Sequence, residues 1–117
     1  MMNLNELKQA LQQQPEQVEF TDTMAVIDAE YDFTPTAFSN GELNNAAGEN
    51  TGSCKIFAFA RLQDLTPAQT LACFGGYYRE QVLANPTGQD HQNIRNFIKH
   101  GWAGIHYEGQ PLTPKNR

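Results

Sequence analysis

The sequence has few cysteines, no run of basic residues and no long apolar stretch, and each shortage excludes a class of protein. Its two cysteines, Cys54 and Cys73, are too few for a disulfide framework and lack the CxxC spacing of a metal or redox pair. We expect both to be reduced and buried as small apolar side chains. Three histidines without a nearby carboxylate pair predict no metal site, and the sequence indicates no cofactor.

Positive charge is also scarce. Eight basic residues stand singly against thirteen acidic ones, which gives a net charge of −5. This balance disfavours a phosphate backbone as partner, so we expect no nucleic-acid binding. The N-terminus lacks the basic start and apolar core of a secretory signal, and no segment is apolar enough to cross a bilayer. We therefore expect a cytoplasmic protein with no membrane insertion.

What the sequence does contain is enough apolar material for one domain, residues 1–117, of which 39% are hydrophobic. The low mean hydropathy of −0.58 reflects surface amides, because the chain carries ten asparagines and eleven glutamines. The end of the chain, from about residue 113, is polar and is expected to be a loose tail.

Helical periodicity and capping signals predict most of the secondary structure. The expected helices start at capping residues Asn3, Thr21, Ser53, Thr66 and Asp90. Residues 54–62 also fit a strand buried on both faces, but the serine cap and the alanines favour a helix. Gly75 and Gly76 lie inside the fourth helix, where they predict a bend or the close approach of another backbone.

Short strands are expected between the helices. Asn40–Gly41 predicts a type I′ hairpin turn between strands at 33–38 and 42–46, and a last strand is expected at 103–107. These strands must pair with one another to satisfy their backbone groups. The sequence therefore predicts an α+β fold, with about five helices packed on a small, mostly antiparallel sheet of short strands.

Four segments carry motifs too long to recur by chance: YDFTP at residues 31–35, continuing to residue 60; FGGYYR at 74–79; HQNIRNF at 91–97; and GWAG at 101–104. Together they resemble the HopJ type III effector family over about residues 4 to 112. The resemblance implies a small bacterial protein of the cytoplasm, which a type III system secretes into host cells. A host or bacterial protein is then an expected partner. The family implies no catalytic residue.

Two polar segments, the loop at 48–55 and the start of the helix at 91–96, supply most of the candidate binding residues, and Asn44 lies shortly before the loop. Free amides and the helix dipole at the start of the 54–62 helix favour an anion, and Lys55 adds charge. An ordinary capped helix start is the alternative there. His91 and Arg95 share one helix face, where a ligand site and a structural clamp both remain open. The candidate ligand-binding residues are Asn44, Asn50, Ser53, Lys55, His91 and Arg95.

The candidates for catalysis are Cys54, Glu49 and His91. A thiol in a first helical turn has a lowered pKa, and a histidine could serve as its base. The alternative is a packed, inert thiol. We interpret the chain as a binding or interaction domain. Its rivals are a small cysteine- or carboxylate-dependent enzyme and a housekeeping protein that binds a small anion between the 54–62 and 91–100 helices.

Overall fold

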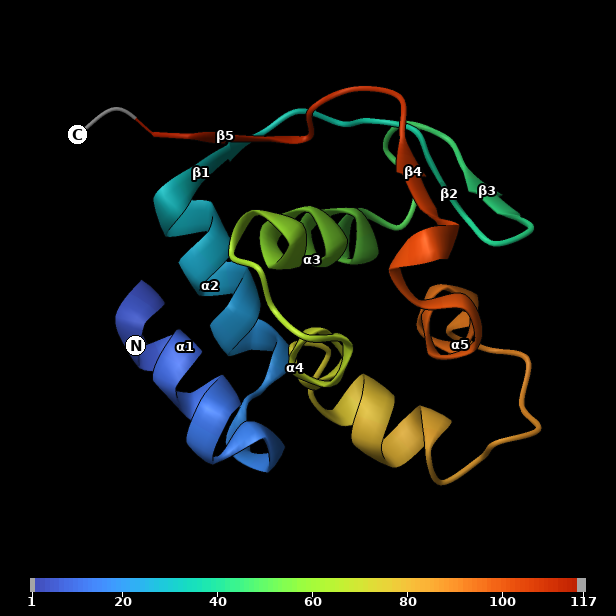
Figure 1. Ribbon diagram of the computed structural model, residues 1–117, viewed down its shortest axis with the longest axis horizontal. Coiled ribbons are helices and arrows are strands. Elements are labelled where there is room, and N and C mark those ends of the chain that lie inside the picture. Colours follow the sequence, from blue (N-terminus) through green and yellow to red (C-terminus); the bar gives the residue numbers. More distant parts are fainter. Residues whose placement is uncertain (1, 116–117) are drawn as a thin grey trace.

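Helices make up most of the computed structural model, which describes residues 2–115 (Figure 1). The α-helices are α1 (Leu4–Gln13), α2 (Phe20–Glu30), α3 (Thr51–Leu62), α4 (Pro67–Ala72) and α5 (Gln92–His100). Two 3₁₀ turns, η1 (Pro15–Gln17) and η3 (Gly101–Gly104), and a π-helical segment, η2 (Tyr77–Val82), complete them. None of the helices in this part of the chain is long and apolar enough to cross a membrane.

α3 lies at the centre, with α1 and α2 on one side, α5 and a hairpin on the other, and α4 below in the view of Figure 1. Its residues Ile56, Phe57, Phe59 and Ala60 are all fully buried. Five consecutive residues, 56–60, are buried, so this part of the helix is enclosed around its circumference and is apolar all round, which explains why its sequence also fitted a buried strand. The prediction of a helix here is confirmed. Phe57 anchors the aromatic core, with ring centroids of Phe97 and Phe74 at 4.9 and 5.5 Å.

The strands form two small antiparallel sheets. β1 (Tyr31–Phe33) pairs with β5 (Leu112–Pro114), and β2 (Phe38–Asn40) lies between β3 (Leu43–Asn45) and β4 (Ile105–Tyr107). The predicted pairing of middle and C-terminal strands in an α+β fold is confirmed. The expected single strand at 33–38 is wrong, because residues 34–37 leave the ladder and separate β1 from β2.

The end of the chain is another correction. Leu112 is buried at 1% exposure, and β5 continues to Pro114 beside β1. Lys115 also donates to two acceptors, the Glu30 carbonyl from its backbone and the Asp28 carbonyl from its side chain, at 3.0 and 2.8 Å. The tail predicted from residue 113 is therefore ordered as far as 115, and its last two residues lie outside the described range.

The hairpin turn differs by one residue from the prediction. Asn40 pairs with Leu43, so the two loop residues are Gly41 and Glu42, and only Gly41 has a positive φ, of 63°. A positive φ at the first loop position alone is the type II′ pattern, not type I′. The hairpin itself is confirmed, and the shift leaves Asn40 as a strand residue with a buried side chain.

The helix starts divide into two groups. The capping boxes Asn3–Glu6 and Thr66–Gln69 form as predicted. Thr21 is not a cap, because the N-cap of α2 lies two residues earlier, at Glu19, which forms a capping box with Asp22. The predicted caps Ser53 and Asp90 are also wrong: α3 and α5 start from Asn50 and His91, both in the left-handed conformation and neither with a side-chain capping bond.

The predicted close approach at the Gly75–Gly76 pair is confirmed. The helix expected through these residues ends at Ala72, and the chain turns before η2 begins. Gly75 has a φ of +60°, and a Cβ there would lie 2.6 Å from the backbone nitrogen of Phe20. The turn therefore packs directly against the start of α2, which a side chain at Gly75 would prevent.

Candidate functional site

Buried asparagine side chains from the hairpin and α5 meet inside the protein, and Asn50, the exposed residue before α3, joins them from the surface. Asn93 is 5% exposed; its Oδ1 accepts from the Nδ2 atoms of Asn40 and Asn45, at 3.1 and 3.2 Å. Asn93 Nδ2 returns a bond to Asn45 Oδ1 at 3.0 Å, and Asn50 Nδ2 donates to the same oxygen at 2.6 Å. This asparagine network fixes the start of α3, the hairpin and the start of α5 against one another.

Both helix starts held by the network lack a side-chain cap, and we call them open helix starts. Asn50 has φ and ψ of 50° and 51°, and its amide is engaged with Asn45 instead of capping α3. His91 has φ and ψ of 52° and 49°, and its Nε2 lies 2.6 Å from Gln81 Oε1. Within residues 2–115, the backbone amides of residues 51–53 and 92–94 donate no hydrogen bond, and the amides of Cys54 and Arg95 are the first in each helix to do so. A helix start without a cap leaves these donors available to a ligand.

The two open helix starts border one cavity of about 480 Å³, which we call the interhelix cavity. α3 contributes Gly52 and Ser53 to its lining, and α5 contributes Gln92, Asn93 and Ile94. The remaining lining residues are Phe20, Leu43, Asn50, Phe74, Tyr77 and His91.

Aromatic rings form one wall of this cavity. The Tyr77 ring meets Phe20 edge-on at 5.1 Å and lies 5.3 Å from the His91 imidazole. Tyr77 is 40% exposed despite these contacts. The cavity therefore combines backbone amide donors on one side with an apolar, partly accessible wall on the other, the usual mixture of a small-molecule site.

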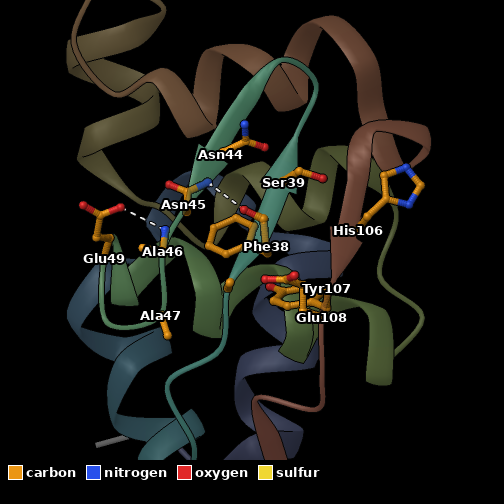
Figure 2. A pocket seen from close by; sticks show the side chains of 11 residues that line it. Phe38, Ser39, Asn44, Asn45, Ala46, Ala47, Glu49, His106, Tyr107 and Glu108 are labelled. Carbon is orange, nitrogen blue, oxygen red and sulfur yellow. Dashed lines mark hydrogen bonds between the residues drawn. The ribbon is translucent and has the colours of Figure 1, made fainter.

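A second cavity of about 630 Å³, the sheet-face cavity, lies over the outer side of β2, β3 and β4 (Figure 2). Ser39 lies between Asn44 and His106 in the strand register, so these polar residues form a row across three strands. Glu49 and Glu108 also line this cavity, and Glu49 Oε1 accepts from the Ala46 amide at 2.9 Å.

The structure separates the residues that the sequence predicted as one site. Asn50, Ser53 and His91 line the interhelix cavity together. Asn44 and Glu49 line the sheet-face cavity instead.

The two cationic candidates line neither cavity. Lys55 Nζ lies 2.9 Å from Asp28 Oδ1 and 5.0 Å from the centre of the Phe33 ring. Arg95 donates to Asp90 Oδ1 at 2.6 Å and to the Asn85 carbonyl at 2.8 Å. This arrangement is the structural clamp that the sequence left open for Arg95.

Cys54 does not have the environment of a nucleophile. It is 1% exposed, and its Sγ lies 3.6 Å from the Thr36 carbonyl oxygen, which keeps it among core atoms. Burial raises the pKa of the thiol and outweighs the bonds and the nearby Lys55 charge that lower it. The lowered pKa expected from the helix start is therefore wrong. Cys54 lines neither cavity, and the His91 ring nitrogen that could serve as base contacts Gln81.

Sequence reasoning missed Asn40 and Asn45 as parts of the network, and Phe20 and Tyr77 as the cavity wall. Asparagines are mostly surface residues, so composition alone placed these among the solvated amides. Among residues 2–115, no group of three or more histidine, cysteine or acidic side chains is arranged to hold a metal ion.

Comparison with known proteins agrees with the motifs of the sequence. The model of the HopJ type III effector protein family matches residues 4–112. A crystal structure of the unknown-function protein VPA0580 is 56% identical and superposes with a TM-score of 0.95, covering 97% of this chain and 95% of that one. No curated protein matches. Because the family match spans nearly the whole sequence, the chain belongs to the HopJ type III effector family.

Proposed function

We propose that this protein is a binding domain that takes a small anionic ligand in the interhelix cavity. One observation carries the proposal: two helices of different parts of the chain both begin, without a cap, at the same cavity of about 480 Å³. Each helix start presents unpaired N–H groups and the positive end of a helix dipole. Together they favour an anion in the cavity that both starts line.

The charges around the cavity support the same ligand class. None of the described residues that line it is acidic, although the chain as a whole has a net charge of −5. Four acidic residues adjoin the lining residues in the sequence: Glu19, Glu42, Glu49 and Asp90. Of these, Asp90 is bonded to the Arg95 guanidinium, which lowers the pKa of that carboxyl, and Glu49 accepts from the Ala46 amide. A ligand would therefore meet neutral donors from the backbone, Ser53 and the amide side chains, with Tyr77 against its apolar part.

The positions of the catalytic candidates support binding over thiol or carboxylate catalysis. Cys54 is buried with a raised pKa, and His91 and Glu49 line different cavities. A nucleophile and its base must lie within hydrogen-bond reach of each other or of a common substrate. Nothing in the arrangement of these three side chains provides that geometry.

Family membership supports a further part of the proposal. The description of the family as type III effectors favours a bacterial protein that is made in the cytoplasm and then secreted into host cells, where a host protein is a partner class. Fusing the chain to a reporter enzyme in a bacterium with and without a working type III system tests this. Reporter activity inside host cells that does not depend on the secretion system would contradict it.

Thermal unfolding with and without inorganic phosphate, small carboxylates and nucleotides tests the anion site. A ligand at 100 times its dissociation constant stabilises the folded state by about 2.7 kcal/mol, which is easily seen as a rise in Tm. Ser53→Asp should abolish that rise, because the new carboxylate repels an anion at the same helix start.

The variant also distinguishes lost binding from lost folding. An acidic residue in the first turn of a helix stabilises the helix, so Ser53→Asp should keep or raise the Tm of the free protein. Gln9→Glu, on the exposed side of α1, adds the same charge far from the cavity and should leave ligand stabilisation unchanged. No Tm change with any anion tested, or equal loss in both variants, would contradict the proposal.

A further inference from the structure

Asn40 and Gly41 form the only Asn–Gly pair in the sequence; it lies at the hairpin turn, where Asn40 is buried and Gly41 half-buried. Glycine has no Cβ, so its backbone nitrogen reaches the side-chain carbonyl of a preceding asparagine more easily than that of any other residue. We propose that Asn40 is a deamidation site that the native fold keeps closed and that becomes reactive when the hairpin separates from β4 and α5.

The reaction needs only water. The Gly41 nitrogen bonds to Asn40 Cγ, the Cγ–Nδ2 bond breaks, and Nδ2 leaves as ammonia with the proton from the Gly41 N–H. This step closes a five-membered succinimide ring. Water then opens the ring at either carbonyl, which gives aspartate or isoaspartate at residue 40 and adds one negative charge.

In the native structure the attacking and the leaving nitrogen are both hydrogen-bonded to other groups, and Asn40 is shielded from water. The attacking nitrogen of Gly41 donates its proton to the Gly104 carbonyl at 3.0 Å. The leaving nitrogen, Asn40 Nδ2, donates to the Asn93 carbonyl at 2.8 Å and to Asn93 Oδ1 at 3.1 Å. Asn40 is 0% exposed, so water does not reach Cγ, and its own carbonyl accepts from Asn96 at 2.8 Å.

The aspartate formed by deamidation does not fit the environment of the native Asn40 side chain. In place of the Nδ2 donor, an aspartate at residue 40 would point an oxygen at two acceptors, Asn93 O and Oδ1. The other oxygen would take the place of Asn40 Oδ1, which is buried and has no partner among the described residues. A buried carboxylate without a donor or a cation is strongly unfavourable. Deamidation therefore turns a reversible opening of the hairpin into a permanent one.

This inference does not depend on the proposed anion site. It depends only on the contacts of the hairpin with β4 and α5. Because Asn93 lines the interhelix cavity and loses its Asn40 partner in the deamidated protein, the reaction would also loosen one wall of that cavity.

Peptide mass spectrometry after parallel incubations tests the proposal. The protein is kept folded in buffer, or unfolded in concentrated urea, at the same mildly alkaline pH and temperature. We expect conversion at residue 40 to be at least about 100-fold slower in the folded protein, because reaction requires opening of the hairpin. In urea, Asn40 should convert before any of the other asparagines.

Refolding tests the consequence of the reaction, namely that deamidation at residue 40 prevents the hairpin from closing again. The deamidated fraction, separated from intact protein by its extra charge on an ion-exchange column, should fail to refold or should unfold at a clearly lower urea concentration. Protein held in urea at mildly acidic pH, where attack by the amide nitrogen is slow, is the control for time spent unfolded and should refold completely. Equal conversion of residue 40 in folded and unfolded protein would overturn the proposal, as would a deamidated fraction with the stability of the intact protein.

Discussion

Asn93→Ala is the substitution that best measures what the asparagine network contributes to stability. Asn93 makes three side-chain hydrogen bonds within the network, to Asn40 and Asn45, at 3.0 to 3.2 Å. Each buried hydrogen bond contributes about 1 kcal/mol net. The partners keep other bonds: Asn40 Nδ2 to the Asn93 carbonyl, and Asn45 Oδ1 to Asn50. We therefore expect a loss of about 3 kcal/mol in the free energy of unfolding, without a large further cost for stranded groups.

Urea denaturation followed by circular dichroism measures this loss as a lower midpoint with an unchanged m-value. Asn44→Ala is the matched control, because Asn44 is exposed on β3 and has no side-chain hydrogen bond with the described residues. It should change stability by less than about 0.5 kcal/mol. If Asn93→Ala also cost less than about 1 kcal/mol, the network would not be what holds α3, α5 and the hairpin together.

Three further outcomes follow from the buried thiols and the close turn. Burial raises the pKa of the Cys73 thiol from its usual 9.0 to about 12, so the folded protein keeps this proton at a pH where the unfolded chain has lost it. The free energy of unfolding should therefore be unaffected below about pH 9 and fall by about 4 kcal/mol as the pH rises toward 12. Cys73→Ala should flatten this alkaline loss in urea titrations at several pH values. Cys54 should react with a thiol reagent at neutral pH only after unfolding, and rapid labelling of the folded protein would contradict its burial. Gly75→Ala should lower the free energy of unfolding by at least about 2 kcal/mol more than Gly48→Ala, because both glycines have a positive φ but only Gly75 faces backbone atoms. Equal losses in urea denaturation would refute the close packing of Gly75 against Phe20.

Local signals in the sequence predicted two helix starts correctly, both of them capping boxes that begin with an asparagine or a threonine. Asn3 with Glu6 and Thr66 with Gln69 need no other part of the chain. The prediction failed at Ser53 and Asp90, because α3 starts three residues before Ser53, at Asn50, and the side chains of Asp90 and Asn50 bind other partners. Asp90 binds Arg95, and Asn50 donates to Asn45. Tertiary contacts thus produced the two open helix starts, which are the features that define the candidate site.

Long-range pairing explains the other misses. β5 exists because Tyr31–Phe33 offers it an edge, and no local property of its residues indicates a strand. The candidate cations Lys55 and Arg95 were assigned to the site from their charge and their local positions. In the structure Lys55 pairs with Asp28, and Arg95 with Asp90 and the Asn85 carbonyl. Other basic side chains also hold elements together: Arg79 donates to the carbonyls of Pro15 and Val18, and Arg61 to that of Ile105. A sequence shows where such charges are, but not which backbone carbonyls they meet.

Amide chemical shifts during a titration with inorganic phosphate test the central claim most directly. Two helix starts that share one anion should respond together: the amides of Gly52 and Ser53 in α3 and of Gln92 and Asn93 in α5 should shift along a single binding curve with one dissociation constant. Shifts confined to one helix start, or none at phosphate concentrations that saturate ordinary anion sites, would show that the cavity between α3 and α5 does not bind an anion.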